Sequence, residues 1–370
     1  MHHALVTGGS GFIGRHLVER LVQQGVRVRC LVRPSSRTDH LVPMGVELVH
    51  GDLSDVDDLC RAAADVEVVF HAAGLTHAIS EAELHRVNGT GCGLLADACR
   101  RVSNPPRLVY LSSLAAAGPA RLDLPPICEE DTPTPISKYG RSKRQGEIEI
   151  QQRAADLPCT IIRPGIVFGP HDPGTLLIMQ PIHQYRLHLV VGFRTPPLSL
   201  IFVNDLVTVL LQAATHGERL EGNPEGDYSA QGYYFACDDS EYPNYRQLGK
   251  RMAKALDQNV FVWPLWRWVG KTLGISSELA NRMRGKSSFL NLDKVIEGSV
   301  PSWACSAAKA RRQLDFAPAQ DIDAALKKTA DWYLHSLSIA DPQTSTDPAV
   351  RVRESAPELV ESATSQSKHD

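Results

Sequence analysis

TGGSGFIG, residues Thr7–Gly14, decides the fold of this 370-residue chain. A short apolar run, residues 4–6, comes directly before it, and apolar residues at helical spacing follow it. Gly8, Gly11 and Gly14 fit the pattern G-x-x-G-x-x-G. Glycines at these places allow a tight turn, a close approach of the backbone to a pyrophosphate, and close contact between a helix and a sheet.

The helix after this turn is expected to begin at Phe12 and Ile13. Its first N–H groups have no partner within the helix, and its dipole places partial positive charge there, so an anion is stabilised at this end. A turn that merely leads into a helix is the alternative. Because the motif lies between a strand and a helix, a dinucleotide site is favoured. We therefore predict that the pyrophosphate is bound by Gly8, Gly11, Phe12, Ile13 and Gly14.

Beyond the turn, apolar runs alternate with helical patterns as far as residue 162. This alternation predicts an α/β fold in which a doubly wound parallel sheet has helices on both faces. The expected strands cover 4–6, 26–32, 46–49, 66–70, 108–111 and 159–162. The expected helices cover 81–101 and 139–153 and, later in the chain, about 204–216 and 244–257.

After Arg163 the alternation loosens. We predict a dinucleotide-binding domain over 1–165, to which some later segments return, and a smaller C-terminal substrate-binding subdomain over 166–337. Residues 341–370 are rich in Pro, Ser, Thr, Asp and Glu without periodicity, which predicts a disordered tail. The apolar stretch 260–275 contains three tryptophans, and we interpret it as a packed helix that lines an apolar pocket. Peripheral contact of this stretch with a membrane surface is the alternative.

Composition narrows the class of partner. The net charge of −3 gives no bulk attraction to nucleic acid. No apolar run has the length of a membrane span, and Met1-His2-His3-Ala4 has no Lys or Arg, so neither a transmembrane segment nor a signal peptide is expected. Eight cysteines without a C-x-x-C pair predict free thiols in a reducing compartment. We therefore expect a cytoplasmic protein.

The end of the second expected strand distinguishes NAD from NADP. An NAD site has Asp or Glu there, which binds the ribose diol. Here the chain reads Arg33-Pro34-Ser35-Ser36, without a carboxylate. Arg33 can pair with a 2′-phosphate, to which Ser35 or Ser36 can also donate a hydrogen bond. We predict NADP as the cofactor, and NAD with a solvated Arg33 remains the alternative.

Three further residues are expected to contact the cofactor. Asp52 and Leu53 follow the third strand, where the carboxylate of Asp52 can accept from the adenine amino group. A simpler explanation of Asp52 is that it caps the helix expected over 55–64. Ala72 belongs to the small residues after the fourth strand, which let the nicotinamide ribose pass close to the backbone.

Tyr139 and Lys143 are the candidate catalytic pair. Residues four apart share one face of a helix, so the ammonium of Lys143 favours the phenolate of Tyr139 and lowers its pKa. Such a tyrosine can exchange a proton with the oxygen of a carbonyl or an alcohol, and the lysine can also hold the cofactor ribose. Ser113, at the end of the fifth strand, can hydrogen-bond the same oxygen. Alone, this spacing is common on solvated helices, but ligands of such sheets bind at this edge.

Thr7–Gly14, Ser113, Tyr139 and Lys143 together resemble the extended short-chain dehydrogenase/reductase superfamily, to which proteins called NAD-dependent epimerase/dehydratase belong. The resemblance covers about residues 1–335. It implies a seven-stranded Rossmann-type sheet, a C-terminal substrate-binding subdomain, a possible homodimer, and Asn88 as a support for the lysine. Further matches are Gly51-Asp52-Leu53, His71-Ala72-Ala73-Gly74, Asn88 with Gly91, Ile162-Arg163-Pro164 and Phe202-Val203-Asn204-Asp205.

Two departures from this resemblance concern the substrate. Sugar-nucleotide epimerases usually carry Asn where this chain has Gly165, and Arg-Asp-Tyr where it has Leu198-Ser199-Leu200. The Asn and the Arg contact the diphosphate side of the substrate in those enzymes. A diphosphate without such partners binds poorly, which argues against a nucleotide-sugar. The pattern is closer to the 3β-hydroxysteroid dehydrogenase and dihydroflavonol reductase branch.

We therefore expect an NAD(P)-dependent oxidoreductase that interconverts a hydroxyl and a ketone on a hydrophobic substrate. Steroid-like, lipid-like and polycyclic molecules all fit this expectation. One alternative is a nucleotide-sugar epimerase or dehydratase that holds NAD tightly. A second alternative is a non-catalytic dinucleotide-binding protein, but members of that kind usually lack the tyrosine or the lysine.

Overall fold

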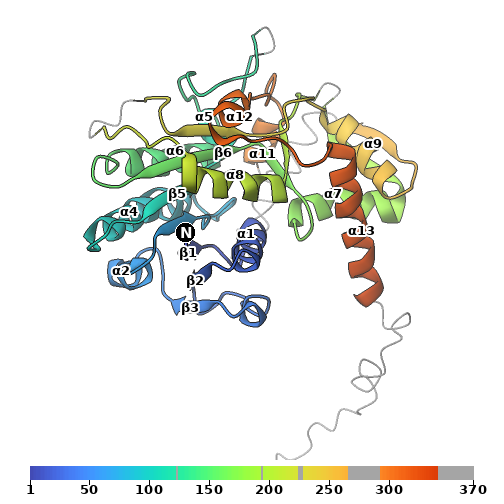
Figure 1. Ribbon diagram of the computed structural model, residues 1–370. Coiled ribbons are helices and arrows are strands. Elements are labelled where there is room, and N and C mark those ends of the chain that lie inside the picture. The colour runs from blue at the N-terminus through green and yellow to red at the C-terminus, as the bar shows by residue number, and fades with distance from the viewer. Residues whose placement is uncertain (122–123, 193–194, 224–227, 266–291, 341–370) are drawn as a thin grey trace, which may run out of the picture.

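The computed structural model describes residues 1–121, 124–192, 195–223, 228–265 and 292–340. Figure 1 shows a central sheet with helices on both of its faces and a smaller lobe beside it. The helices of this lobe are α7 (Pro173–Tyr185), α9 (Tyr245–Ala255) and α13 (Ile322–Ala340).

Seven parallel strands form the central sheet in the order β10-β6-β5-β4-β1-β2-β3. The strand order reverses between β1 and β4, and doubly wound sheets bind ligands at such a switch point. The predicted fold class is therefore confirmed. The strands are β1 (His3–Thr7), β2 (Arg27–Val32), β3 (Glu47–His50), β4 (Val68–His71), β5 (Arg107–Leu111), β6 (Cys159–Pro164) and β10 (Tyr233–Ala236).

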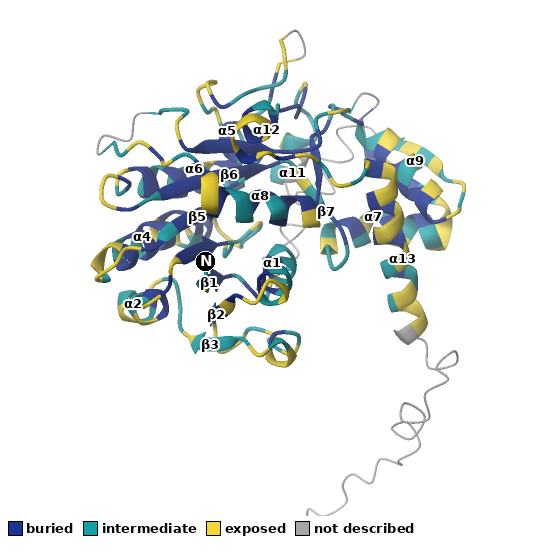
Figure 2. Ribbon diagram, viewed as in Figure 1, coloured by how far each residue is buried: buried dark blue, intermediate teal, exposed yellow. Residues whose placement is uncertain are grey.

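The strands are apolar along their length because both faces of the sheet are covered. Successive residues of a strand face opposite sides, so Ala4 and Val6 belong to one hydrophobic core and Leu5 to the other. Figure 2 shows the sheet and the inner helix faces as buried. The first core includes α1 (Phe12–Gln23) and α8 (Val203–His216), and the second includes α2 (Val56–Ala63), α4 (Gly91–Arg101) and α6 (Lys138–Gln151).

The helix expected over 81–101 has an irregular turn in its middle. It consists of α3 (Glu81–His85), the π-helical turn η2 (Arg86–Thr90) and α4. The wide turn places the buried Asn88 amide against the backbone of Leu75, with which it exchanges two hydrogen bonds of 2.8 Å. A π-turn of this kind often occurs at a functional site.

Shorter elements complete the described part of the chain. Two small parallel sheets pair β7 with β9 and β8 with β11. Strand β10 and helix α8 pack on the central sheet although they come late in the chain. The remaining elements are η1 (Val42–Met44), α5 (Leu114–Ala117), β7 (Ile166–Phe168), β8 (Leu187–Val191), β9 (Leu200–Phe202), β11 (Phe261–Leu265), α11 (Leu292–Glu297) and α12 (Ala308–Leu314).

The expectation of a helix over 260–275 is wrong for its first part. Residues 261–265 form strand β11, which pairs in parallel with β8. Phe261 and Trp263 are 63% and 54% exposed, so their rings do not line a buried pocket. Aromatic residues at alternate positions suit a strand as well as a helix, and the pairing with β8 decides between them. Residues 266–275, like the tail 341–370, lie outside the described residues.

Among the helices of the described residues, none combines the length and the apolar character needed to cross a membrane.

Candidate active site

The glycine turn joins β1 to α1 as the motif predicts. Gly8 has φ +75°, a left-handed conformation, and a Cβ there would lie 2.6 Å from the Ala73 nitrogen. Gly11 donates a backbone hydrogen bond of 3.0 Å to the Gly8 oxygen and caps α1 without a side chain. The first N–H groups of α1, which include those of Phe12 and Ile13, are therefore the natural donors for an anion at this turn.

Gly14 fixes the distance between α1 and the turn. A Cβ at this position would clash with the carbonyl oxygen of Gly8. We expect Gly14→Ala to lower the free energy of unfolding by about 1–3 kcal/mol, because the helix must move away from β1. Urea unfolding measures this change, and Gln23→Ala at the far end of α1 is the control. A Gly14→Ala protein as stable as the control would contradict the tight contact.

The loops after β2 and β3 contain the residues expected at the adenosine side. Arg33 is exposed, and its backbone nitrogen donates to Ser36 Oγ at 3.1 Å. Asp52 does not cap α2, because the carboxylate of Asp55 accepts from the first N–H groups of that helix. Instead, Asp52 accepts from the Ser54 nitrogen at 2.9 Å and from its hydroxyl at 2.7 Å. The capping explanation of Asp52 is therefore wrong.

The carboxylate of Asp52 is favoured by its surroundings. The two hydrogen bonds from Ser54 lower its pKa, and the charges of Arg86 and Arg33 lower it further. Leu53 packs beside Gly91, where an added Cβ would lie 3.3 Å from the Leu53 Cβ. Asp52 and Leu53 thus lie at the carboxyl edge of the sheet, next to β2 and α4.

Tyr139 lies in the first turn of α6. Ser137 caps this helix by accepting from the Gly140 nitrogen at 3.0 Å. The backbone nitrogen of Tyr139 also donates to a carboxylate oxygen of Asp293 at 3.3 Å. Asp293 comes from α11, about 150 residues further along the chain, and no sequence pattern pointed to it.

Lys143 lies one turn after Tyr139, and its ammonium is buried. Its Nζ donates to the Leu111 carbonyl oxygen at 2.7 Å and lies 4.4 Å from the centre of the Tyr110 ring. Burial lowers the pKa of Lys143 to about 8, although Cys92 and Glu147 act in the opposite direction. The ammonium therefore loses its proton more easily than an exposed lysine does.

Ser113 and Ala72 follow β5 and β4, and both of these chain segments approach this lysine. The Ser113 side chain caps α5 by accepting from the Ala115 nitrogen at 3.1 Å, which leaves the hydroxyl proton available for donation. Ala72 follows β4, and its nitrogen donates to the Thr7 oxygen at 3.1 Å. A Cβ on Gly74 would lie 3.6 Å from the Lys143 Nζ, so the loop after β4 passes directly over the ammonium.

Asn88 supports that loop rather than the lysine itself. Its Oδ1 accepts from the Leu75 nitrogen, and its Nδ2 donates to the Leu75 oxygen and, at 2.9 Å, to the Ser142 hydroxyl. Ser142 in turn donates to the Tyr139 carbonyl oxygen at 2.8 Å. Asn88 thereby joins the loop after β4 to the turn of α6 that contains Tyr139 and Lys143.

A buried ion pair includes a residue of α6 that lies one turn after Lys143. Arg163 of β6 donates to both carboxylate oxygens of Glu147, at 2.8 and 2.6 Å, and both side chains are fully buried. Ser112 donates to the same carboxylate at 2.6 Å, and Arg144 does so at 3.0 Å. Because Ser112 precedes Ser113 and Glu147 follows Lys143 by one turn, this cluster fixes β5 against α6.

Packing fills the two positions at which the resemblance predicts diphosphate contacts in epimerases. A Cβ on Gly165 would clash with the Ser199 carbonyl oxygen, so a longer side chain does not fit. Leu198 and Leu200 are buried, and Ser199 accepts from the Cys305 nitrogen at 2.8 Å. Neither segment presents a cation or an amide to a ligand.

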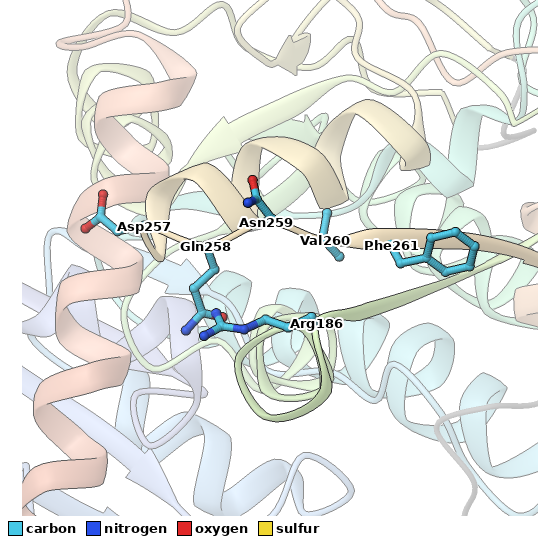
Figure 3. A pocket seen from close by; sticks show the side chains of 6 residues that line it. All are labelled: Arg186, Asp257, Gln258, Asn259, Val260 and Phe261. Carbon is cyan, nitrogen blue, oxygen red and sulfur yellow. The ribbon is translucent and has the colours of Figure 1, made fainter.

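A groove of about 580 Å³ lies elsewhere, between the end of α7 and the start of β11. Figure 3 shows its lining side chains, among them Arg186, Gln258 and Phe261. None of the predicted site residues lines it. The groove is therefore separate from the candidate active site around Tyr139 and Lys143.

The fold and the glycine turn together define a Rossmann-type dinucleotide-binding protein. The chain belongs to the NAD dependent epimerase/dehydratase family, whose model matches residues 4–228. The predicted resemblance to the extended short-chain dehydrogenase/reductase superfamily is thus confirmed.

Two curated relatives are reductases by name. One is a ceramide reductase from Caulobacter vibrioides, 36% identical over 206 residues, which are 56% of this chain and 59% of the relative. The other is a 4-hydroxy-2-methyl-3-oxo-4-farnesyl-3,4-dihydroquinoline-1-oxide ketoreductase from Stigmatella aurantiaca, 32% identical over 220 residues, 57% of this chain and 64% of the relative. The match therefore spans less than two thirds of either relative.

A solved structure shows the same fold over nearly the whole chain. It is a UDP-glucose 4-epimerase from Thermotoga maritima with UDP-glucose, with a TM-score of 0.71 and 20% identity. The alignment covers 90% of this chain and 99% of the epimerase. At this identity the likeness concerns the fold alone.

Proposed function

We propose that this protein is an NAD(P)-dependent oxidoreductase that interconverts a hydroxyl and a ketone on a hydrophobic molecule. The buried ammonium of Lys143 carries the proposal, because it lies at the carboxyl edge of β5, one turn from Tyr139 and beside the loop of Ala72. Burial of a cation without an ion-pair partner costs free energy, and groups of this kind are concentrated at functional sites.

The proposed roles follow from the chemistry of each group. Tyr139 moves the proton to or from the substrate oxygen, and Ser113 donates a hydrogen bond to that oxygen. Lys143 holds the cofactor ribose and favours the phenolate of Tyr139. The bound nicotinamide supplies or accepts the hydride. Asn88 keeps the loop after β4 in place over Lys143.

The hydrophobic substrate is supported by two independent observations. The two reductase relatives have names that denote a ceramide and a farnesylated quinoline, both with large apolar parts. In this chain, Gly165 and Leu198 offer no group for a diphosphate.

We expect that the purified protein oxidises NADPH with a long-chain or polycyclic ketone and leaves UDP-glucose unchanged. Epimerisation of UDP-glucose without net use of cofactor would overturn the proposal.

The nucleotide-sugar epimerase remains the second candidate. The observation that favours it is the similarity to a UDP-glucose 4-epimerase from Vibrio cholerae, which is 25% identical over 342 residues, 90% of this chain and 95% of that protein. It requires a diphosphate site other than the positions of Gly165 and Leu198. The homodimer and the substrate-binding role of residues 166–337 stay predictions.

Arg33 decides the preference for the cofactor. We expect Arg33→Gln to weaken NADPH binding by about tenfold or more, because a charge-assisted hydrogen bond to the 2′-phosphate is lost, while NADH binding changes by less than about twofold. Quenching of intrinsic fluorescence measures both affinities, and Arg37→Gln in the same loop is the control. Equal losses for NADPH and NADH would remove Arg33 from the phosphate site.

A further inference from the structure

The ammonium of Lys143 is buried and has few partners. Among the residues that the structure describes, no carboxylate forms an ion pair with its ammonium. The nearby carboxylate of Glu147 is engaged by Arg163, Arg144 and Ser112. What contacts the ammonium directly is the Leu111 carbonyl, at 2.7 Å, and the face of the Tyr110 ring, at 4.4 Å from its centre.

The Tyr110 ring is held in place from several sides. It stacks on the imidazole of His71, its direct neighbour on β4, with ring centres 5.4 Å apart and an angle of 23° between the planes. The Tyr110 hydroxyl lies in a corner next to Gly146, where an added Cβ would be 2.7 Å from it. The ring is fully buried in the second hydrophobic core.

The imidazole below the ring is also fixed. His71 Nδ1 shares a hydrogen bond of 2.7 Å with the Thr7 hydroxyl, and its Nε2 lies 3.2 Å from the Cys92 sulfur. Burial, helped by the charge of Lys143, lowers the pKa of His71 to about 3. The imidazole is therefore neutral at every working pH and adds no repulsion to the ammonium.

We propose that Tyr110 is a positioning residue for Lys143, because its ring face holds the ammonium at the carboxyl edge of β5 while the imidazole of His71 fixes the ring. The negative face of an aromatic ring attracts a cation, most strongly where water is excluded. This role rests on the proposed function, in which Lys143 serves the cofactor ribose. Tyr110 itself touches neither substrate nor cofactor in this account.

The other titratable groups that face Lys143 are accounted for. Burial raises the pKa of Tyr110 well above its usual value and that of the Cys92 thiol to about 11, so both are neutral. Burial opposes the ionisation of Glu147, but Arg163 lowers its pKa below the usual value. Glu147 is therefore charged over the whole pH range around 8 in which Lys143 titrates. Among the described residues, Tyr139 is the remaining titratable group, and the test is carried out in a Tyr139→Phe protein, which removes the phenol.

The test measures the dissociation constant of NADPH as a function of pH in Tyr139→Phe. Loss of the ammonium charge weakens the hydrogen bond of Lys143 to the ribose, so log Kd should bend upward near pH 8, where Lys143 loses its proton. Adding Tyr110→Phe keeps the ring and removes a hydroxyl, and the bend should stay. Adding Tyr110→Leu removes the ring face, and the bend should fall by roughly one pH unit.

Fluorinated phenylalanines at position 110 test the same point without changing the packing. One, two and three fluorines weaken the negative ring face in steps, so the bend should move to lower pH in the same order. A bend that stays in place with the leucine and with the fluorinated rings would overturn the role of Tyr110. So would normal NADPH binding without any bend, because Lys143 would then not serve the ribose. Failure of the unmodified protein to bind NADPH or NADH at any pH would overturn the proposed function itself.

Discussion

Tyr139→Phe should reduce the rate of hydride transfer by about a thousandfold or more and leave cofactor affinity within about threefold of the unmodified protein. The phenol is the proposed proton donor, and general acid–base groups contribute about 10²–10⁴ in rate. Phenylalanine keeps the ring and removes only the hydroxyl. A single-turnover measurement of NADPH oxidation, with the ketone that the protein reduces, gives the rate of the chemical step.

Tyr185→Phe is the matched control for this variant. Tyr185 is 72% exposed at the end of α7 and has no place in the proposed mechanism, so its substitution should leave the rate unchanged. A Tyr139→Phe protein that retains near-normal turnover would remove Tyr139 from the mechanism. A loss of cofactor binding with a normal rate of chemistry would instead give Tyr139 a binding role only.

Glu147→Ala should cost about 3–5 kcal/mol in the free energy of unfolding, because it leaves the guanidinium of Arg163 buried without its partner. Urea unfolding followed by circular dichroism measures the loss. Glu149→Ala is the control on the same helix, since its ion pair with Arg153 is partly exposed and should contribute about 1 kcal/mol or less. Losses of similar size in both variants would contradict the role given to the buried pair.

Two further observations test the buried pair separately. The double substitution Glu147→Leu with Arg163→Met should recover much of the lost stability, because it removes both charges together. The pKa of Glu147 is lowered in the folded protein, so its contribution is present above the unfolded pKa of about 4.3 and is lost as the pH falls through the folded value. The difference between the unmodified protein and Glu147→Ala should therefore shrink in acid.

The sheet could be predicted from the sequence because local pattern and burial agree. Strands such as residues 4–6 and 26–32 are apolar on both faces, and the structure places them as β1 and β2 with bounds that differ by about one residue. The glycine turn was equally predictable, since Gly8 and Gly14 stand where a left-handed turn and a close helix contact require them. In both cases the residues that form the sequence pattern lie close together in the chain.

Two predictions were wrong, one because of a contact between distant parts of the chain and one because of a local competition between two residues. Residues 261–265 are a strand because β8 pairs with them, and their own sequence does not contain that information. Asp55 rather than Asp52 caps α2, because the helix begins at Val56 and two aspartates three residues apart compete for the same role.

The surroundings of the candidate catalytic residues were the least predictable. Arg163 gave a usable signal, because a charged residue within an apolar strand needs a buried partner. That this partner is Glu147 depends on how α6 lies on β6. The positions of Tyr110 and His71 under Lys143 likewise follow from the register of β4 and β5. The sequence predicts the candidate reacting groups, and the tertiary contacts show which residues hold them in place.

The bound nucleotide of the purified protein tests the central claim most directly. We would quantify any nucleotide released from the protein and then titrate the emptied protein with NADPH and NADH by fluorescence quenching. The proposed oxidoreductase must exchange its cofactor at every turnover, so nucleotide should be absent or freely exchangeable, and NADPH should bind more tightly than NADH. A full complement of NAD that survives purification and does not exchange with added NADPH would contradict this account and favour an epimerase or dehydratase.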